Sequence, residues 1–168
     1  IRFTQGECCT EGLTAWPERP VDDPLSLTFT GANWGPQDAS HPKPGETIDE
    51  DEVRSLLGHV VMRMGGPVIW GCVREPKKAS HSSCEAEIGA MDEGCKSVQQ
   101  LRNIMQDLKL PHVDRPTPLY NDNNGAVEWS EGVAISKKMR HLNIRECAVR
   151  GAQQNQEIAV DTIPGHSN

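Results

Sequence analysis

A long amphipathic stretch between residues 83 and 108 sets the strongest limit on how this chain folds. Its apolar side chains recur every three or four residues, so they form one stripe along a single long helix. The stripe consists of Ile88, Met91, Cys95, Val98, Leu101, Met105 and Leu108. Ser82 or Ser83 is suited to cap the helix start. A helix with one apolar face must pack on another layer, which the rest of the chain has to supply.

Strand patterns on both sides of this helix indicate that the other layer is a sheet. Residues 25–30 alternate apolar and polar side chains and lead into a turn-rich stretch at 31–36. Gly65-Gly66 is a turn signal between two apolar runs and predicts a hairpin. The expected order is strand 25–30, strand 58–64, strand 67–72, helix 83–108, strand 118–122, helix 125–131, a loop and helix within 133–152, and strand 156–163. This order predicts an α/β fold, in which a mixed five-stranded sheet carries packed helices.

Composition excludes a membrane protein and favours a reducing compartment. No apolar run approaches the length of a membrane span. The six cysteines, at positions 8, 9, 72, 84, 95 and 147, include no C-x-x-C pair and no zinc-ligand spacing with histidine. We therefore expect free, mostly buried thiols in an intracellular protein, cytoplasmic or nuclear, with a disulfide at Cys8 or Cys9 as the alternative. The Trp residues are expected to pack in the core or the hairpin, and His59 and His141 to be hydrogen-bonded structural residues.

The charge distribution limits the ways in which the chain can meet nucleic acid. A net charge of −7 argues against strong autonomous binding to a phosphate backbone. A local basic stripe is nevertheless present, and it is either a solvated helix face or a set of phosphate contacts for a duplex. The stripe consists of Lys137, Lys138, Arg140 and Arg145, and Lys77 and Lys78 in an earlier loop could extend it.

Acidic residues at two places suggest a site for a hard divalent cation. Glu85 and Glu87 open the long helix, and Asp122 ends a short apolar strand. A helix-borne Glu beside a strand-end Asp supplies the oxygen ligands that Mg²⁺ prefers. The competing interpretation is ordinary: acidic residues favour helix starts, and a turn Asp often caps the next helix.

Five short sequence motifs, spread along the chain from the N- to the C-terminus, resemble motifs of the ribonuclease H domain of copia-type retrotransposon polyproteins. Residues 2–13 resemble the family's connector after the reverse transcriptase, and 54–60 with 66–70 resemble its Arg-Ser-Thr-Ser-Gly-Tyr-Val … Gly-Pro-Ile-Ser-Trp hairpin. Residues 82–87 (Ser-Ser-Cys-Glu-Ala-Glu) match Ser-Ser-Thr-Glu-Ala-Glu, and 120–123 (Tyr-Asn-Asp-Asn) match Tyr-Cys-Asp-Asn. Residues 140–145 (Arg-His-Leu-Asn-Ile-Arg) match Lys-His-Ile-Asp-Ile-Arg.

This resemblance implies a ribonuclease H-like fold that cuts the RNA strand of RNA–DNA hybrids with two Mg²⁺ or Mn²⁺ ions. It assigns Glu87, with Glu85 as the runner-up, and Asp122 as metal ligands, and it matches His166 loosely to a histidine that helps product leave. The family's first-strand Asp-Ala-Asp-Trp is Gly31-Ala32-Asn33-Trp34 here, so the first carboxylate is absent. Asp38 lies downstream in a loop and could replace the missing carboxylate only if the backbone took a different path. The last Asp of the family lies beyond Asn168.

The resemblance also implies a domain organisation and a function. Residues 1–24 form a connector arm and 25–168 an RNase H-like domain, with an acidic loop at 35–52 and the C-terminal helix missing. We expect hybrid hydrolysis that is weak or absent. The alternative is a non-catalytic module for binding a protein partner or for self-association on the same scaffold.

Overall fold

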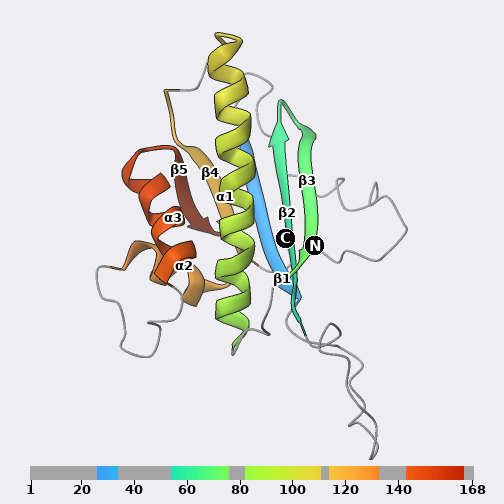
Figure 1. Cartoon of the computed structure of the whole chain (residues 1–168), viewed down its shortest axis with the longest axis vertical. Coiled ribbons are helices and arrows are strands. Elements are labelled where there is room, and N and C mark those ends of the chain that lie inside the picture. The colour runs from blue at the N-terminus through green and yellow to red at the C-terminus, as the bar shows by residue number, and fades with distance from the viewer. Residues whose placement is uncertain (1–25, 34–53, 76–81, 111–113, 133–142, 165–168) are drawn as a thin grey trace, which may run out of the picture.

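The structure of the protein is a computed structural model, which describes residues 26–33, 54–75, 82–110, 114–132 and 143–164. These residues form a mixed sheet and three helices (Figure 1). The elements are β1 (Leu27–Asn33), β2 (Leu56–Arg63), β3 (Gly66–Arg74), α1 (Ser83–Asp107), β4 (Thr117–Asn121), α2 (Asn124–Glu131), α3 (Asn143–Gln154) and β5 (Ile158–Thr162). The order and type of the predicted elements are confirmed, with boundary shifts of a few residues.

The five strands lie in the order β3-β2-β1-β4-β5. β2 is antiparallel to both β1 and β3, whereas β4 is parallel to both β1 and β5. β1 is therefore the central strand, where the antiparallel hairpin meets the parallel pair. The carboxyl ends of β1 and β4 point the same way, so the last residues of these two strands lie at the same edge of the sheet.

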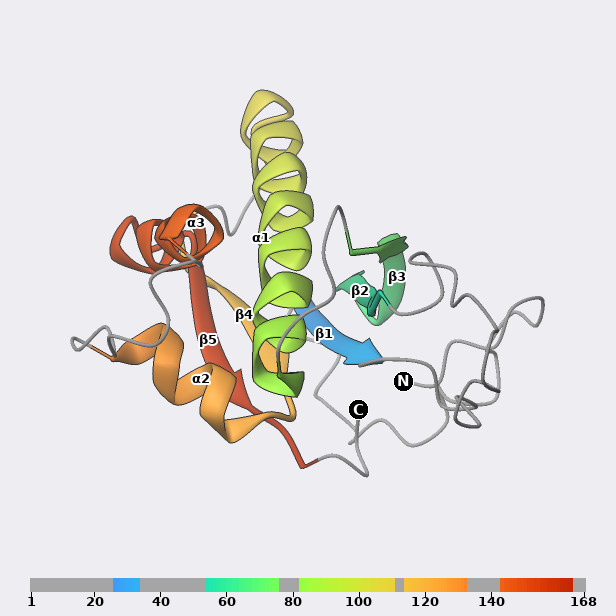
Figure 2. The ribbon, with the colours of Figure 1, turned by 60° about the horizontal axis from the view of Figure 1, so that its bottom comes forward.

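The main core lies between one face of the sheet and all three helices. Figure 2 shows α2 and α3 together on one side of α1, the side of β4 and β5. Helix α1 contributes the predicted stripe, with Ile88, Met91 and Val98 fully buried. The inward side chains of the strands complete this core; they include Val61, Leu119 and Ile158. Ser82 caps α1 by accepting a hydrogen bond from the backbone N–H of Glu85 (3.2 Å). The sequence therefore located the core helix correctly, together with its cap.

β1 departs from the prediction in two ways. It extends through Asn33, because residues 31–33 pair with residues 56–58 of β2 instead of forming a turn. Both of its faces are buried, although the alternating pattern indicated one. Thr28 and Thr30 face α1, where Gly94 leaves room for their methyl groups, and Phe29 stacks on Tyr120 with ring centroids 5.5 Å apart. A central strand takes its burial from its neighbours, so small polar residues are tolerated on the inner face.

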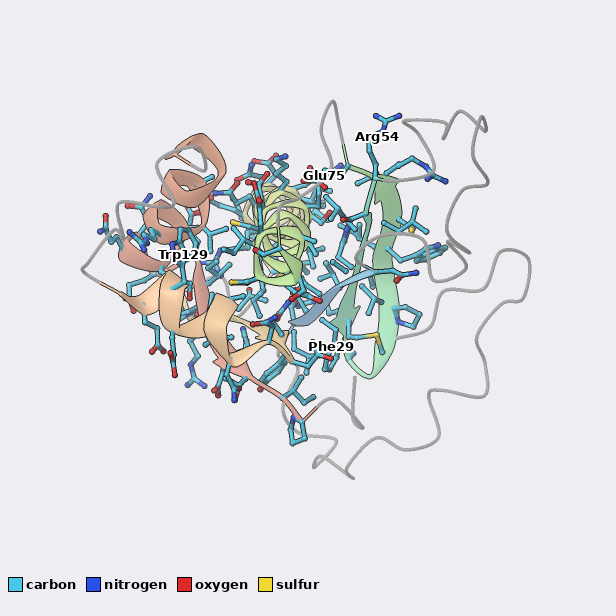
Figure 3. The ribbon with its side chains drawn as sticks, turned by 90° about the horizontal axis from the view of Figure 1, so that it is seen from below. Phe29, Arg54, Glu75 and Trp129 are labelled. Carbon is cyan, nitrogen blue, oxygen red and sulfur yellow. The ribbon has the colours of Figure 1, made fainter. Side chains whose placement is uncertain are left out.

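The predicted β2–β3 hairpin is confirmed, but its turn lies one residue earlier than the Gly65-Gly66 signal indicated, because Gly66 already pairs with Arg63 as the first residue of β3. Met64 and Gly65 both have positive φ (52° and 79°), as a two-residue hairpin loop requires. Trp70 is 69% exposed, so the prediction that it packs in the core or hairpin is wrong. β3 is an edge strand in the described part of the sheet, and Trp70 lies on its face away from α1. At the open end of the hairpin, Arg54 Nη1 donates to the carbonyl of Glu75 (3.2 Å; Figure 3).

Other expectations have mixed outcomes. His59 is buried and its Nε2 lies 2.8 Å from Ser97 Oγ, which confirms a structural histidine. Trp129 of α2 packs half-buried against the core, with the Arg150 guanidinium 4.4 Å above its ring (Figure 3). Three described cysteines are free, but of these only Cys95 is fully buried while Cys72 is exposed. No helix in the described part of the chain is long and apolar enough to cross a membrane.

Candidate functional site at the carboxyl ends of β1 and β4

Glu87 is a buried carboxylate that reaches from α1 to the central strands. It lies in the second turn of the helix, and only 8% of its surface is exposed. Its Oε1 accepts a hydrogen bond from the backbone N–H of Ala32 in β1 (3.1 Å). Its Oε2 accepts one from Asn121 Nδ2 at the end of β4 (2.9 Å). Glu85 precedes Glu87 by two residues and so lies on another side of α1. Glu87 is thus the carboxylate that meets β1 and β4.

Asn121 is the hub of the contacts around Glu87. Its side chain is completely buried, because the alternation of β4 turns Thr117, Leu119 and Asn121 toward the helices. Besides Glu87, its Nδ2 donates to the hydroxyl (3.1 Å) and the carbonyl (3.3 Å) of Thr30. Its Oδ1 accepts from the backbone N–H of Asn123 (2.9 Å). One amide side chain therefore connects α1, β1, β4 and the start of α2.

Asp122 and Gly31 lie side by side at the same edge of the sheet. β1 and β4 pair through Phe29 and Tyr120, and continuing this parallel register by two residues sets Gly31 beside Asp122. Asp122 is exposed, in contrast to Asn121. Helix α2 begins directly after it, with Asn123 as the cap that accepts from the backbone N–H of Ala126 (3.1 Å). Asn123, not Asp122, is therefore the residue that caps α2.

Electrostatics couple the two predicted carboxylates. Burial raises the pKa of the Glu87 carboxyl above its ordinary value, and the negative charge of Asp122 raises it further. The hydrogen bonds from Asn121 and Ala32 oppose this pKa shift because they stabilise the charged form. The assignment of Glu87 and Asp122 as metal ligands stays a prediction.

We next compare the ligand atoms available at this edge with those that a pair of divalent cations requires. Two dications require several carboxylate oxygens free to ligate them. Each Glu87 oxygen accepts one N–H bond and keeps a lone pair, but Gly31 offers no side chain, so Glu87 and Asp122 are the two carboxylates that the described residues supply at this edge. Within the described ranges, no three His, Cys, Asp or Glu side chains gather as a metal site would require. These residues do not fit a two-metal centre.

The remaining predicted site residues lie outside what the structure describes. His166 and Asp38 fall in undescribed segments, as do Lys137, Lys138 and Arg140. Arg145 belongs to α3 by its backbone, but its side chain is not among those described. The arm at 1–24 and the acidic loop at 35–52 are likewise outside these ranges. The assignments to substrate binding and product release therefore stay predictions.

Sequence reasoning missed Asn121 and its partner Thr30. Both are polar residues inside strands, and Asn121 directly precedes the charged Asp122 that matches the family motif. One signal was present: in the alternation of β4, Asn121 shares its face with Leu119, so a polar side chain had to point into the core. A buried amide requires partners for all its polar atoms, which indicates a network at this position.

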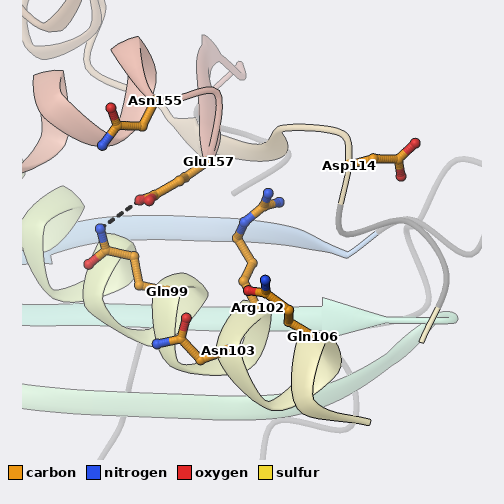
Figure 4. A pocket seen from close by; sticks show the side chains of 7 residues that line it. All are labelled: Gln99, Arg102, Asn103, Gln106, Asp114, Asn155 and Glu157. Carbon is orange, nitrogen blue, oxygen red and sulfur yellow. Dashed lines mark hydrogen bonds between the residues drawn. The ribbon is translucent and has the colours of Figure 1, made fainter. Parts of the chain in front are cut away.

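A second polar feature lies at the other end of α1. A cleft of about 620 Å³ is bordered by the second half of α1, the turn before β5 and Asp114 (Figure 4). Its side chains bind one another: Gln99 Nε2 donates to Glu157 Oε2 (2.8 Å; Figure 4), and Arg102 Nη1 donates to the carbonyl of Arg115 (2.7 Å). These contacts fasten α1 to β4 and β5, and the cleft includes neither Glu87 nor Asp122.

Solved structures of ribonucleases H share this architecture. The chain is similar to LC11-RNase H1, isolated from compost by a metagenomic approach, with 14% identity, a TM-score of 0.58 and coverage of 87% of this chain and 89% of that one. LC11-RNase H1 in complex with an RNA/DNA hybrid gives 12% identity and a TM-score of 0.57, covering 85% and 88%.

A retroviral protein gives a similar match. A mutant of the prototype foamy virus protease–reverse transcriptase shows 16% identity and a TM-score of 0.51, covering 89% of this chain and 19% of that one. No family model matches the sequence. At these identities the likeness concerns the fold, which is α/β and RNase H-like, as predicted.

Proposed function

We propose that this chain is a retroelement RNase H-like domain of the copia type. Its ancestral reaction is hydrolysis of the RNA strand of RNA–DNA hybrids with Mg²⁺ or Mn²⁺, and that hydrolysis is weak or absent here. The observation that carries this proposal is the edge at β1 and β4. There Glu87 meets the ends of β1 and β4, and Asp122 and Gly31 lie near the same ends. The resemblance matches Glu87 and Asp122 to the family's second and third carboxylates and Gly31 to the first, and we adopt that match. The copia assignment itself rests on the sequence words.

A cleavage assay tests the proposal directly. A labelled RNA–DNA hybrid is incubated with the unmodified chain, Gly31→Asp and Asp122→Asn, each with Mg²⁺ and with Mn²⁺. We expect little or no cleavage by the unmodified chain and more by Gly31→Asp, because the added carboxylate lies beside Asp122. If the unmodified chain cleaves the hybrid robustly and Asp122→Asn abolishes this cleavage, the site is intact. That result would refute the proposal that hydrolysis is weak or absent here.

Hybrid binding is a separable part of the proposal. The solved complex of LC11-RNase H1 with a hybrid shares this fold, and Lys137, Lys138, Arg140 and Arg145 are the proposed phosphate contacts. Fluorescence anisotropy with a labelled hybrid should show weaker binding for each of the single variants Lys137→Glu and Lys138→Glu and a smaller dependence on salt, because fewer counterions are released. Lys109→Glu, at an exposed position after α1, is the matched charge control and should change affinity less.

A second candidate function is a non-catalytic interaction module. The observation that favours it is Trp70, which is 69% exposed on the face of the hairpin away from α1, with Met64 (77%) exposed in the turn. Val68 (43%) is also exposed, whereas Val73 (40%) pairs with the buried Leu57 and lies on the opposite face. A large exposed aromatic side chain on an edge strand is a candidate contact for a partner. Analytical ultracentrifugation over a concentration series distinguishes self-association from a monomer. A monomer at all concentrations would leave only a different protein as the partner.

A further inference from the structure

The contacts of Glu87 show how a buried carboxylate is accommodated where the donor set does not fit a metal pair. Burying an anion costs several kcal/mol unless partners compensate its charge. Glu87 is 8% exposed, and each of its two oxygens accepts one N–H donor. The shorter of these hydrogen bonds comes from the side chain of Asn121, at 2.9 Å. The positive end of an amide dipole therefore faces the carboxylate.

Asn121 is itself fixed by everything around it. Its Nδ2 reaches Thr30 as well as Glu87, and its Oδ1 holds the backbone N–H of Asn123 (2.9 Å). Because both ends of the amide are bound, the Nδ2 end cannot turn away from Glu87 without losing these contacts. The amide is thus held in the one orientation that presents its donor to Glu87.

We propose that the Asn121 side-chain amide takes the charge-compensating place of a divalent cation beside Glu87. The resulting link between α1, β1 and β4 holds this edge of the sheet together without metal. This inference rests on the proposed function for the choice of site, but it concerns the stability of the folded chain and not cleavage. It predicts that the stability of the chain is independent of Mg²⁺, whether or not a hybrid is cleaved.

The first experiment exchanges the amide for a carboxylate. Asn121→Asp turns the Nδ2 donor into an acceptor and sets a second anion against Glu87, whereas Asn123→Asp adds the same charge two residues away at a helix cap, where Asp is equally favoured. In EDTA we expect the Tm of Asn121→Asp to fall by about 8 °C, and that of Asn123→Asp to move by less than about 2 °C.

Addition of Mg²⁺ then separates the two arrangements. It should raise the Tm of Asn121→Asp, because a cation bound only by the folded state stabilises that state. It should leave the unmodified chain and Asn123→Asp unchanged. A saturable rise in the Tm of the unmodified chain would overturn the proposal. The proposal also fails if Asn121→Asp is as stable as Asn123→Asp in EDTA, or if Mg²⁺ does not affect the Tm of Asn121→Asp.

A second measurement needs no substitution, so it stands even where Asn121→Asp does not fold. The side-chain NH₂ of Asn121 and the backbone N–H of Ala32 are both observable in a ¹H–¹⁵N spectrum of the unmodified chain. We expect both signals to keep their chemical shifts when Mg²⁺ is added. A saturable shift of both would place the ion at Glu87 and refute the metal-independent link. Hybrid cleavage enters neither readout, so failure here is distinct from failure of the proposed function.

Discussion

The edge at Glu87 and the face of the β2–β3 hairpin break the ordinary rule of burial in opposite ways. At the first, polar groups are inside: Glu87 and Asn121 are buried between α1 and the central strands. At the second, large apolar groups are outside, with Trp70 and Met64 mostly exposed. Buried polar groups and exposed apolar patches are the informative exceptions in a folded chain.

The two exceptions differ in what they contribute. The buried polar groups at Glu87 bind one another, so removing one leaves its partners unsatisfied and costs stability. The exposed side chains of the hairpin cover little of the core, so removing one costs little stability but changes what the surface can bind. Stability and association should therefore respond to substitutions at different places. Substitutions in both regions test this separation, from the largest expected effect to the smallest.

Asn121→Ala should be the most destabilising. It removes the donor to Glu87 and Thr30 and leaves a buried carboxylate with one fewer partner. We expect a loss of about 3 kcal/mol in the free energy of unfolding, measured by urea denaturation. Asn124→Ala, at an exposed position in the first turn of α2, is the control and should cost less than about 0.5 kcal/mol. Equal losses for the two variants would contradict a special role for the buried amide.

Gly94→Ala should follow, because α1 and β1 are in close contact at this residue. A Cβ at Gly94 would lie 2.5 Å from the Thr30 methyl group, and Thr30 is fully buried in a central strand. Overpacking of this kind should cost about 2 kcal/mol. Gly151→Ala in α3 meets nothing within 4 Å and should gain up to about 1 kcal/mol from helix propensity. Urea unfolding of both variants provides the test. An unchanged free energy of unfolding for Gly94→Ala would show that β1 shifts to make room for the added methyl group.

Glu87→Gln should change how stability depends on pH. The pKa of Glu87 is raised in the folded state, so the folded chain binds this proton more tightly than the unfolded chain does. The associated stability is present at low pH and is lost as pH rises from the ordinary pKa through the raised folded-state pKa. Over that window, the unmodified chain should lose stability relative to Glu87→Gln. Parallel curves of unfolding free energy against pH would argue against the raised pKa.

Trp70→Thr should have the smallest effect on stability and the clearest effect on association. Trp70 is 69% exposed, and Thr retains strand propensity, so the unfolding free energy should change by less than about 0.5 kcal/mol. If the hairpin face binds a second copy of the chain, sedimentation should shift toward the monomer. A large loss of stability would instead mean that Trp70 supports the fold.

Much of the fold was available from the sequence because its signals are local. The stripe from Ile88 to Met105 specified α1, and the Gly65-Gly66 signal indicated the hairpin, although its turn is one residue earlier, at Met64-Gly65. Errors arose where neighbours decide the outcome. The sequence predicted a turn at residues 31–33, but these residues pair with β2. It predicted that Trp70 is packed, but Trp70 is exposed on an edge strand. Pairing partners and edge positions depend on strand order, which a local pattern does not contain.

For the candidate site, the sequence named Glu87 and Asp122 through their family words and showed that Gly31 lacks the expected carboxylate. It did not identify the partner of Glu87. Asn121 comes 34 residues after Glu87, and no spacing rule connects them. Their contact depends on the parallel pairing of β4 with β1 and on the packing of α1 across both strands.

By itself, then, the sequence determined which segments are helices and strands and which charged residues belong near one edge of the sheet, because periodicity and short words carry that information. The tertiary structure alone decided which groups donate hydrogen bonds to Glu87. Hydrogen bonding requires donor and acceptor within about 3 Å, and only the assembled sheet and helix bring the Asn121 amide to that distance, in the place where a metal ion was expected.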